Sequence, residues 1–318
     1  AVEIDLIPVL EYTHFDAMKQ FNNADWVPQT MQSRLIKDGE FTILEQCAFM
    51  KKGEEANYVT SNRVVSSFET DRIRFIGANG YGTFANPLSL LEPELSNYQA
   101  LREDNIAATM HHMGSMKKGQ TERLITQLGQ YTDFEFELKE MAKYRVEKNV
   151  DKAFAELGAS WNKYLDRFQV KTPSADFNTL VNIHNPKQCL TTKNWSRFLS
   201  LYQLGLGARG IGFRDTSQDL IGVMGLCPDE TTEMLQKLLS TQKANGSAMH
   251  QFFPLSMVAT EGDSEEMEDR PNYYGDDHLW IVQTVAEYLK ETGDFDFLDV
   301  EVKYYDKDEK GTVLDHLQ

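Results

Sequence analysis

Residues 121–144 read Thr121-Glu-Arg-Leu-Ile-Thr-Gln-Leu-Gly-Gln-Tyr-Thr-Asp-Phe-Glu-Phe-Glu-Leu-Lys-Glu-Met-Ala-Lys-Tyr144, and the hydrophobic period changes within them. The first part, Thr121–Leu128, is one of several short runs rich in apolar and β-branched residues, which is the pattern of strands. From Phe134 onward the apolar side chains recur at helical spacing. The sequence therefore predicts β structure before about residue 132 and helices after it.

The β part extends from this stretch back to the first residue. Further runs rich in Val, Ile, Thr, Phe and Tyr include Phe41–Leu44 and Tyr58–Thr60. Turn residues separate such runs at Ala78–Gly82 and Met116–Gly119. We therefore predict an antiparallel β-sandwich domain over residues 1–131.

The helical part extends to the last residue. Two helices over 132–172 are predicted to connect the halves, and Gly293 is predicted to end a later helix as a C-cap. Helices that recur between polar loops over 173–318 suggest an α/α toroid. The individual helices are expected at 176–184, 190–204, 216–225, 229–244, 276–292 and from about 312.

Composition limits the partners of this protein. The 318 residues include 32 Lys and Arg against 49 Asp and Glu, a formal net charge of −17. Such a surface repels nucleic acid and anionic lipid headgroups, so we expect neither as a partner. A neutral ligand such as a sugar is compatible with this charge. No apolar run reaches the roughly 18 residues of a spanning helix.

The cysteines and the two ends of the sequence give further expectations. Cys47, Cys189 and Cys227 are few, widely spaced and odd in number, which favours a reducing, cytoplasmic location over a disulfide scaffold. The sequence begins with Ala1 inside a strand-like pattern and ends with Gln318 inside a helix-like one. We expect it to be part of a longer protein.

The densest concentration of polar chemistry is Gly205-Leu-Gly-Ala-Arg-Gly-Ile-Gly-Phe-Arg-Asp-Thr-Ser-Gln-Asp219. Glycine lets backbone approach a ligand closely, and Arg and Asp give the directional hydrogen bonds that sugar hydroxyls require. Arg214 or Asp219 could equally serve as internal salt-bridge partners. The segment has neither a P-loop ending nor the βαβ context of a dinucleotide site.

A second candidate is Tyr273-Tyr-Gly-Asp-Asp-His-Leu-Trp280. Its carboxylates could form the edge of a sugar site with Trp280 as a stacking face. Asp276 or Asp277 could instead cap the following helix, which is the simpler interpretation of either taken alone. An Asp-x-His metal site has no third ligand in view, so no metal is expected.

Two loops supply the remaining candidates. His250 and Gln251 in Asn245-Gly-Ser-Ala-Met-His-Gln-Phe-Phe-Pro254 could contact a ligand, or the loop could simply be anchored by its aromatic residues. In the β part, Trp26 within Phe21–Pro28 is either a core residue or a sugar platform.

Several of these motifs together resemble glycoside hydrolase family 94, which contains cellobiose, cellodextrin, chitobiose, laminaribiose and cellobionic acid phosphorylases. The similar stretches are Ser67–Gly77, Arg209–Asp219, Thr241–Gln251 and Asp276–Trp280. The resemblance runs the length of the chain. It implies a multidomain β + α fold: an antiparallel β-sandwich, a helical linker and the first part of a six-hairpin α/α barrel.

The resemblance also implies an activity: inverting phosphorolysis of a β-glucosyl disaccharide or oligosaccharide to α-glucose 1-phosphate. It implies inorganic phosphate as co-substrate, no cofactor and a homodimer. The loop Asn22–Pro28 lacks the Arg and Phe that the cellobiose enzymes place at the acceptor site, so laminaribiose and cellobionic acid are equally open as substrates.

The resemblance assigns roles to individual positions. Arg209 and Asp215 match the Arg and Asp that bind the non-reducing glucosyl unit, and Arg197 lies where the family has a phosphate-binding Arg. The general acid of the family is expected beyond Gln318, so no catalytic residue is assigned within the chain. The predicted substrate-binding set is completed by Arg214, Asp276, Asp277, His250 and Trp26.

Three other functions remain open from the sequence. The chain could be a carbohydrate-binding piece without turnover, a structural piece of a larger assembly, or part of a hydrolase on the same barrel. The missing general acid separates the phosphorylase from the first two, and phosphate-dependent release of α-glucose 1-phosphate separates it from the hydrolase.

Overall fold

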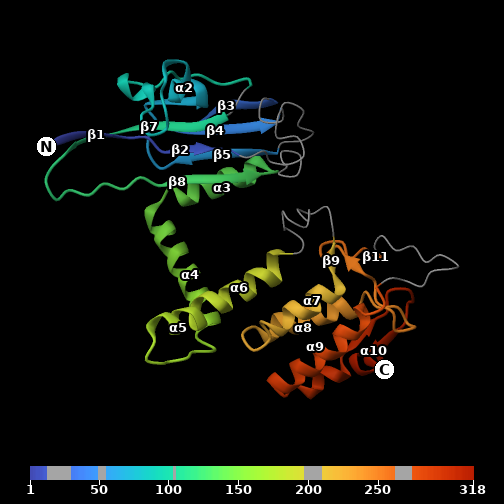
Figure 1. Ribbon diagram of the computed structural model, residues 1–318. Helices are drawn as coiled ribbons and strands as arrows, with labels where there is room; N and C mark the ends of the chain where they lie inside the picture. The colour runs from blue at the N-terminus through green and yellow to red at the C-terminus, as the bar shows by residue number, and fades with distance from the viewer. Residues whose placement is uncertain (13–29, 49–54, 103–104, 197–209, 262–273) are drawn as a thin grey trace. The chain divides into compact units, whose positions relative to one another are not determined.

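The computed structural model describes residues 1–12, 30–48, 55–102, 105–196, 210–261 and 274–318 (Figure 1). The chain divides into two compact units, Ala1–Glu156 and Leu157–Gln318. The two units are described separately below.

The first unit contains two four-stranded antiparallel sheets (Figure 1). In one sheet the order is β1-β7-β2, and β6 also pairs with β7; in the other the order is β3-β4-β5-β8. The strands are β1 (Val2–Leu6), β2 (Val9–Glu11), β3 (Met31–Asp38), β4 (Phe41–Ala48), β5 (Ala56–Ser61), β6 (Ser67–Asp71), β7 (Asn105–Met116) and β8 (Thr126–Tyr131).

The alternation of side chains along β4 fixes how these sheets are layered. Ile43 packs in a cluster with Met141 of α3 (Phe134–Tyr144), whereas its neighbour Leu44 packs with Phe68 and Ala107 of the other sheet. Successive strand residues point to opposite faces, so both faces of β4 are covered. The predicted antiparallel sandwich is confirmed.

The far side of the β7 sheet is covered by α2 (Arg72–Ile76) (Figure 1). Ile106 and Met110 of β7 pack there against Phe75 and Ile76, in a separate apolar cluster. The first unit is thus two sheets with helical cover on both outer faces.

The predicted change to helical structure near residue 132 is also confirmed. The Asp133 side chain accepts a hydrogen bond from the Phe136 amide and so caps α3. After α3 comes α4 (Glu147–Leu165), and its residues span the division between the units. The strand predicted at Thr121–Leu128 is wrong in its bounds, because β8 begins at Thr126 and continues to Tyr131.

The second unit is helical, with short strands. The sequence predicted two helices, at 176–184 and 190–204. As far as Ser196, these residues form consecutive α- and π-helical segments. Pro186 lies in the first turn of one of them, α6. The principal elements are α5 (Ala175–Thr179), η4 (Leu180–His184), α6 (Asn185–Thr191), η5 (Thr192–Ser196), α7 (Phe213–Ile221), α8 (Pro228–Leu239), α9 (Asp277–Thr292), η6 (Phe295–Asp299) and α10 (Val313–Leu317).

Short strands join these helices. In the three-stranded sheet, β10 (Gln251–Phe252) pairs with both β9 (Ile211–Gly212) and β11 (Ala259–Thr260), antiparallel in each case. A separate pair is formed by β12 (Glu301–Lys303) and β13 (Lys310–Thr312).

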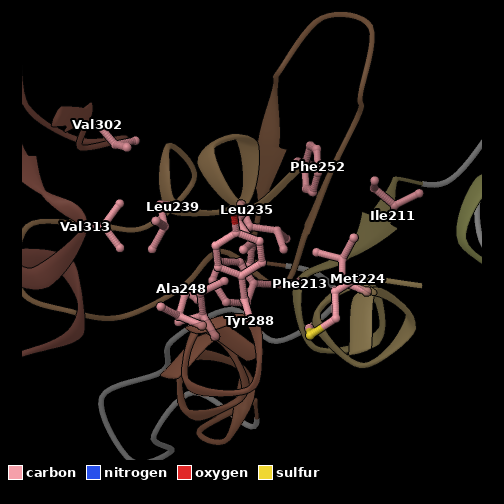
Figure 2. Close-up of a cluster of buried hydrophobic side chains, with 14 of the residues drawn as sticks. Ile211, Phe213, Met224, Leu235, Leu239, Ala248, Phe252, Tyr288, Val302 and Val313 are labelled. Atoms are coloured by element: carbon pink, nitrogen blue, oxygen red, sulfur yellow. The ribbon is translucent and has the colours of Figure 1, made fainter. Parts of the chain in front are cut away.

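The core of the second unit lies between α7, α8 and α9 (Figure 2). Phe213, at the start of α7, is fully buried among side chains that include Leu235 and Tyr288. Because Phe213 belongs to this core, α7 begins at residue 213 and not at 216 as the sequence predicted. The next helix, α8, ends at Leu239 and not at 244.

The predicted C-cap at Gly293 is confirmed, because its φ is +70° and its amide donates to the Leu289 carbonyl. We expect Gly293→Ala to destabilise the protein by about 1–2 kcal/mol, since an L-residue is strained at positive φ. Gly158→Ala is the matched control, because Gly158 lies within α4 and an added Cβ meets nothing within 4 Å. That change should stabilise by roughly 0.5–1 kcal/mol. Urea midpoints that move in the same direction would contradict this account.

His111 of β7 is expected to make the stability of the first unit depend on pH. Its Nδ1 lies 3.1 Å from the Val64 carbonyl oxygen and its Nε2 lies 3.2 Å from Thr109 Oγ1. Burial lowers the pKa of His111 below the ordinary value of 6.5, and the charge of Arg63 acts in the same direction. The folded state therefore binds this proton less readily than the unfolded state. The associated stability is present above pH 6.5 and is lost as the pH falls toward the folded pKa.

We expect His111→Asn to flatten this pH dependence, because the amide keeps a nitrogen near the position of Nδ1 and does not titrate. Hydrogen exchange of β7 peptides, corrected for intrinsic rates, measures the local stability. An equal loss of protection in wild type and variant between about pH 7.5 and 5.5 would rule out His111 as the titrating group.

Candidate functional site

The sheet and the helix packing of the second unit bring together five of the residues predicted from the sequence. Antiparallel pairing places Gly212 opposite Gln251, and the Phe213 amide donates to the His250 carbonyl at 3.0 Å. The first turn of α7 therefore lies beside the loop before β10, and α7 also packs against α9. The residues gathered in this way are Arg214, Asp215, His250, Asp276 and Asp277.

Glycine permits the close approach of the two strands. A Cβ on Gly210 would lie 2.6 Å from the carbonyl oxygen of Phe252, so no larger residue fits without moving the backbone. The hydroxyl of Thr284 on α9 donates to the Ser217 carbonyl of α7 at 3.0 Å. The first contact fixes the chain just before α7, and the second joins the middle of α7 to the middle of α9.

An ion pair joins the two motifs. Arg214 Nη1 lies 3.1 Å from each carboxylate oxygen of Asp276, and the indole nitrogen of Trp280 donates to Asp276 Oδ2 at 3.4 Å. The hydrogen bond from Arg214 lowers the pKa of Asp276, and the same contact raises the pKa of Arg214. Both groups therefore stay charged across the physiological range.

The Arg214–Asp276 ion pair decides between the interpretations of Asp276 that the sequence left open. Asp276 occupies the N-cap position of α9, but its side chain makes no capping hydrogen bond. The sequence therefore predicted the N-cap position of Asp276 correctly. The expected capping hydrogen bond is wrong, because the carboxylate accepts hydrogen bonds from Arg214 instead. The interpretation of Arg214 as a salt-bridge partner is confirmed.

Asp215 lies in the first turn of α7 and is 32% exposed. A carboxylate is favoured there by the free amides and the helix dipole. Its Oδ1 lies 3.9 Å from Arg214 Nε, and its Oδ2 would lie 3.2 Å from a Cβ on Gly212. A partly exposed carboxylate beside a held guanidinium can bind vicinal sugar hydroxyls, since one accepts and the other donates hydrogen bonds.

A second polar pair joins Asp277, the carboxylate next to Asp276 in the sequence, to His250. Asp277 is 1% exposed, and its Oδ2 lies 2.9 Å from His250 Nδ1. The His250 ring stacks on Tyr274, with centroids 3.5 Å apart and planes 15° apart. Asp277 is therefore a buried partner of His250 and not a group open to solvent.

The remaining predicted residues cannot be placed in this site. Arg197, Arg209 and Trp26 lie outside the described residues. Sequence reasoning missed Tyr274, although it stands in the motif quoted for the carboxylates, because nothing in the sequence placed His250 beside it. Within the described part of the chain, no group of three or more His, Cys, Asp or Glu side chains could hold a metal ion. None of the described helices has the length and apolar character needed to cross a bilayer.

Comparison with known protein families gives matches over both units. Residues 1–147 match the supersandwich domain of glycosyl hydrolase 94, and residues 160–318 match the catalytic domain of the glycosyl hydrolase 94 superfamily. The chain belongs to glycosyl hydrolase family 94. The residues of the Arg214–Asp276 pair and the His250–Asp277 pair lie within the family 94 catalytic-domain match.

Curated relatives of this family 94 chain are phosphorylases. An N,N'-diacetylchitobiose phosphorylase from Vibrio proteolyticus is 31% identical over 276 residues, which cover 82% of this chain and 34% of that protein. The protein of the same name from Vibrio furnissii is 31% identical over 275 residues, with the same coverage of both chains. A solabiose phosphorylase from Paenibacillus borealis is 29% identical over 252 residues, covering 79% of this chain and 29% of that protein. The chain spans about a third of the length of the curated relatives it matches.

Proposed function

We propose that the protein containing this chain catalyses inverting phosphorolysis of a β-linked disaccharide or oligosaccharide. The products are the α-sugar 1-phosphate and the released acceptor sugar. The observation that carries this proposal is the pair Arg214–Asp215 in the first turn of α7, with Arg214 held by Asp276, inside a family 94 catalytic domain. The phosphorylase relatives support the reaction type.

In this reaction an acid protonates the glycosidic oxygen while phosphate attacks the anomeric carbon from the opposite face. An inverting hydrolase also needs a base to activate water. Phosphate is already an anionic nucleophile, so one carboxylic acid suffices. The protein then has to hold sugar and phosphate in line and stabilise the developing charge.

We assign Asp215 and Arg214 to the transferred sugar, together with Arg209, and we assign Arg197 to phosphate. Asp276 is unsuitable as the general acid, because such a group must be protonated at working pH and Arg214 lowers the pKa of Asp276. Asp277 is buried against His250. We propose that the acid is supplied by a residue outside these 318 residues.

The transferred sugar is proposed to be glucose, as the family resemblance of the motifs suggests. N-acetylglucosamine is the second candidate, because two relatives are named for N,N'-diacetylchitobiose. We further propose three domains: a sandwich at 1–131, a linker at 132–172 and the first part of a six-hairpin barrel at 173–318. A cytoplasmic homodimer completes the proposal; the free cysteines Cys47, Cys189 and Cys227 suit a reducing compartment.

The test is a panel of disaccharides incubated with the complete protein, with and without phosphate. The panel contains cellobiose, laminaribiose, cellobionic acid, N,N'-diacetylchitobiose and solabiose. We expect one of them to release its acceptor only when phosphate is present, with one phosphate consumed per bond broken. Release without phosphate would indicate the hydrolase instead. Binding of a sugar without any release would indicate the carbohydrate-binding alternative.

A further inference from the structure

His250 is held by two contacts of its side chain and one of its main chain. Asp277 Oδ2 lies 2.9 Å from Nδ1, the Tyr274 ring stacks on one face, and the main-chain carbonyl of His250 accepts the Phe213 amide. A surface histidine that served only to cover the core would need none of these constraints. The ring is therefore fixed in orientation as well as in position.

The Asp277 contact also fixes the proton on the ring. A carboxylate accepts hydrogen bonds, so the bond at 2.9 Å requires a proton on Nδ1. The other nitrogen, Nε2, has no hydrogen-bond partner among the residues that the structure describes, and the side chain is 24% exposed. His250 thus presents Nε2 at an accessible surface beside the first turn of α7.

His250 is the one side chain among the described residues that hydrogen-bonds to the Asp277 carboxylate. Its Oδ1 is buried and makes no hydrogen bond within the described residues, so the hydrogen bond with His250 and the nearby charge of Arg214 compensate this carboxylate. Burying a charge is costly unless it is paired. A carboxylate retained there at such a cost is well explained if it orients a working imidazole.

We propose that Asp277 is a positioning residue that acts through His250, and that His250 Nε2 contacts a hydroxyl of the sugar bound at Arg214 and Asp215. This inference rests on the proposed function, because it takes a sugar as the ligand of that surface. It changes the role of Asp277 from a direct sugar ligand to a residue that sets the tautomer and direction of its neighbour. A neutral imidazole with the proton on Nδ1 accepts a sugar O–H at Nε2.

Two substitutions of His250 separate this role from a structural one. His250→Asn keeps an amide near the position of Nδ1, so Asp277 keeps a partner, but the Nε2 position is lost. His250→Gln places its amide near the position of Nε2. We expect His250→Asn to lower kcat/KM by about 10- to 100-fold, the effect of losing one hydrogen bond to a bound substrate. His250→Gln should retain more activity than His250→Asn. His250→Asn, in which Asp277 keeps a partner, should also keep the wild-type unfolding midpoint.

A double variant of His250 and Asp277 measures whether the two side chains act together. Asp277→Asn is expected to lower kcat/KM to a similar extent, and His250→Asn with Asp277→Asn should fall no further than His250→Asn alone. Wild-type activity in His250→Asn would overturn the proposal, since a purely structural pair would survive that change. Fully multiplicative losses would also overturn it, because they would mean that Asp277 acts independently of His250.

A spectroscopic readout keeps this test separate from the proposed function. Nitrogen-15 spectra of histidine-labelled protein report which ring nitrogen of His250 carries the proton. We expect the Nδ1–H form in the wild type and a mixture of tautomers in Asp277→Asn. An unchanged tautomer in that variant would exclude the positioning role of Asp277, even if the protein were inactive. If no disaccharide is cleaved but the tautomer responds to Asp277→Asn and the Nε2 shift responds to added disaccharide, the proposed function fails and the inferred contact stands.

Discussion

Replacing Asp215 with Asn is expected to lower kcat/KM for phosphorolysis by about 100- to 1,000-fold, with the unfolding temperature nearly unchanged. The magnitude corresponds to losing one or two charge-assisted hydrogen bonds to the transferred sugar. The fold should survive, because Asp215 is 32% exposed and the core position beside it is filled by Phe213. Steady-state kinetics with the best substrate of the panel and a thermal melt measure the two quantities.

The matched control for Asp215→Asn is Glu233→Gln. Glu233 is also a helical carboxylate in the second unit, but it is exposed and pairs with Lys237 one turn along α8. An exposed pair of this kind contributes little to stability, and its loss should leave the kinetics unchanged. Equal rates for wild type and Asp215→Asn would remove Asp215 from the sugar site.

Replacing Phe213 with Ala is expected to lower the unfolding free energy of the second unit by about 3–5 kcal/mol. Phe213 is 0% exposed within the cluster between α7, α8 and α9 (Figure 2), and the alanine would leave a cavity there. Urea unfolding followed by hydrogen exchange of α8 and α9 peptides measures the change within this unit.

Phe295→Ala is the control for this cavity. The same side chain is removed, but Phe295 is 65% exposed, so we expect a change of only about 0.5 kcal/mol or less. Similar losses at both positions would mean that burial of Phe213 does not stabilise the start of α7. Since Phe213 precedes Arg214 and Asp215, a destabilised α7 should also weaken sugar binding.

Much of the fold follows from the sequence, because its signals are local. The short runs of apolar and β-branched residues and the turn residues before 132 predicted the sandwich, and the helical spacing from Phe134 predicted α3 and α4. Element bounds failed where tertiary contacts decide them. The start of α7 moved to residue 213 because Phe213 fills the core, and pairing with β5 displaced the last strand of the sandwich to Thr126–Tyr131.

The site was predictable in its residue types and less so in its contacts. The motifs identified Arg214, Asp215, Asp276 and Asp277. For Asp276, however, the sequence offered only a sugar contact or a helix cap and did not indicate the ion pair with Arg214. That pair depends on α7 lying against α9, which brings residues 62 positions apart into contact. The stacking of Tyr274 on His250 depends on the same long-range packing.

The central claim is that phosphate, and not water, displaces the acceptor with inversion. Proton and phosphorus NMR of one reaction mixture tests both parts, using the complete protein, the cleaved disaccharide of the panel and inorganic phosphate. We predict that the first product seen is the α-anomer of the sugar 1-phosphate, formed as inorganic phosphate disappears in equal amount. Free sugar as the first product with the phosphate signal unchanged, or a β-sugar 1-phosphate, would contradict the account.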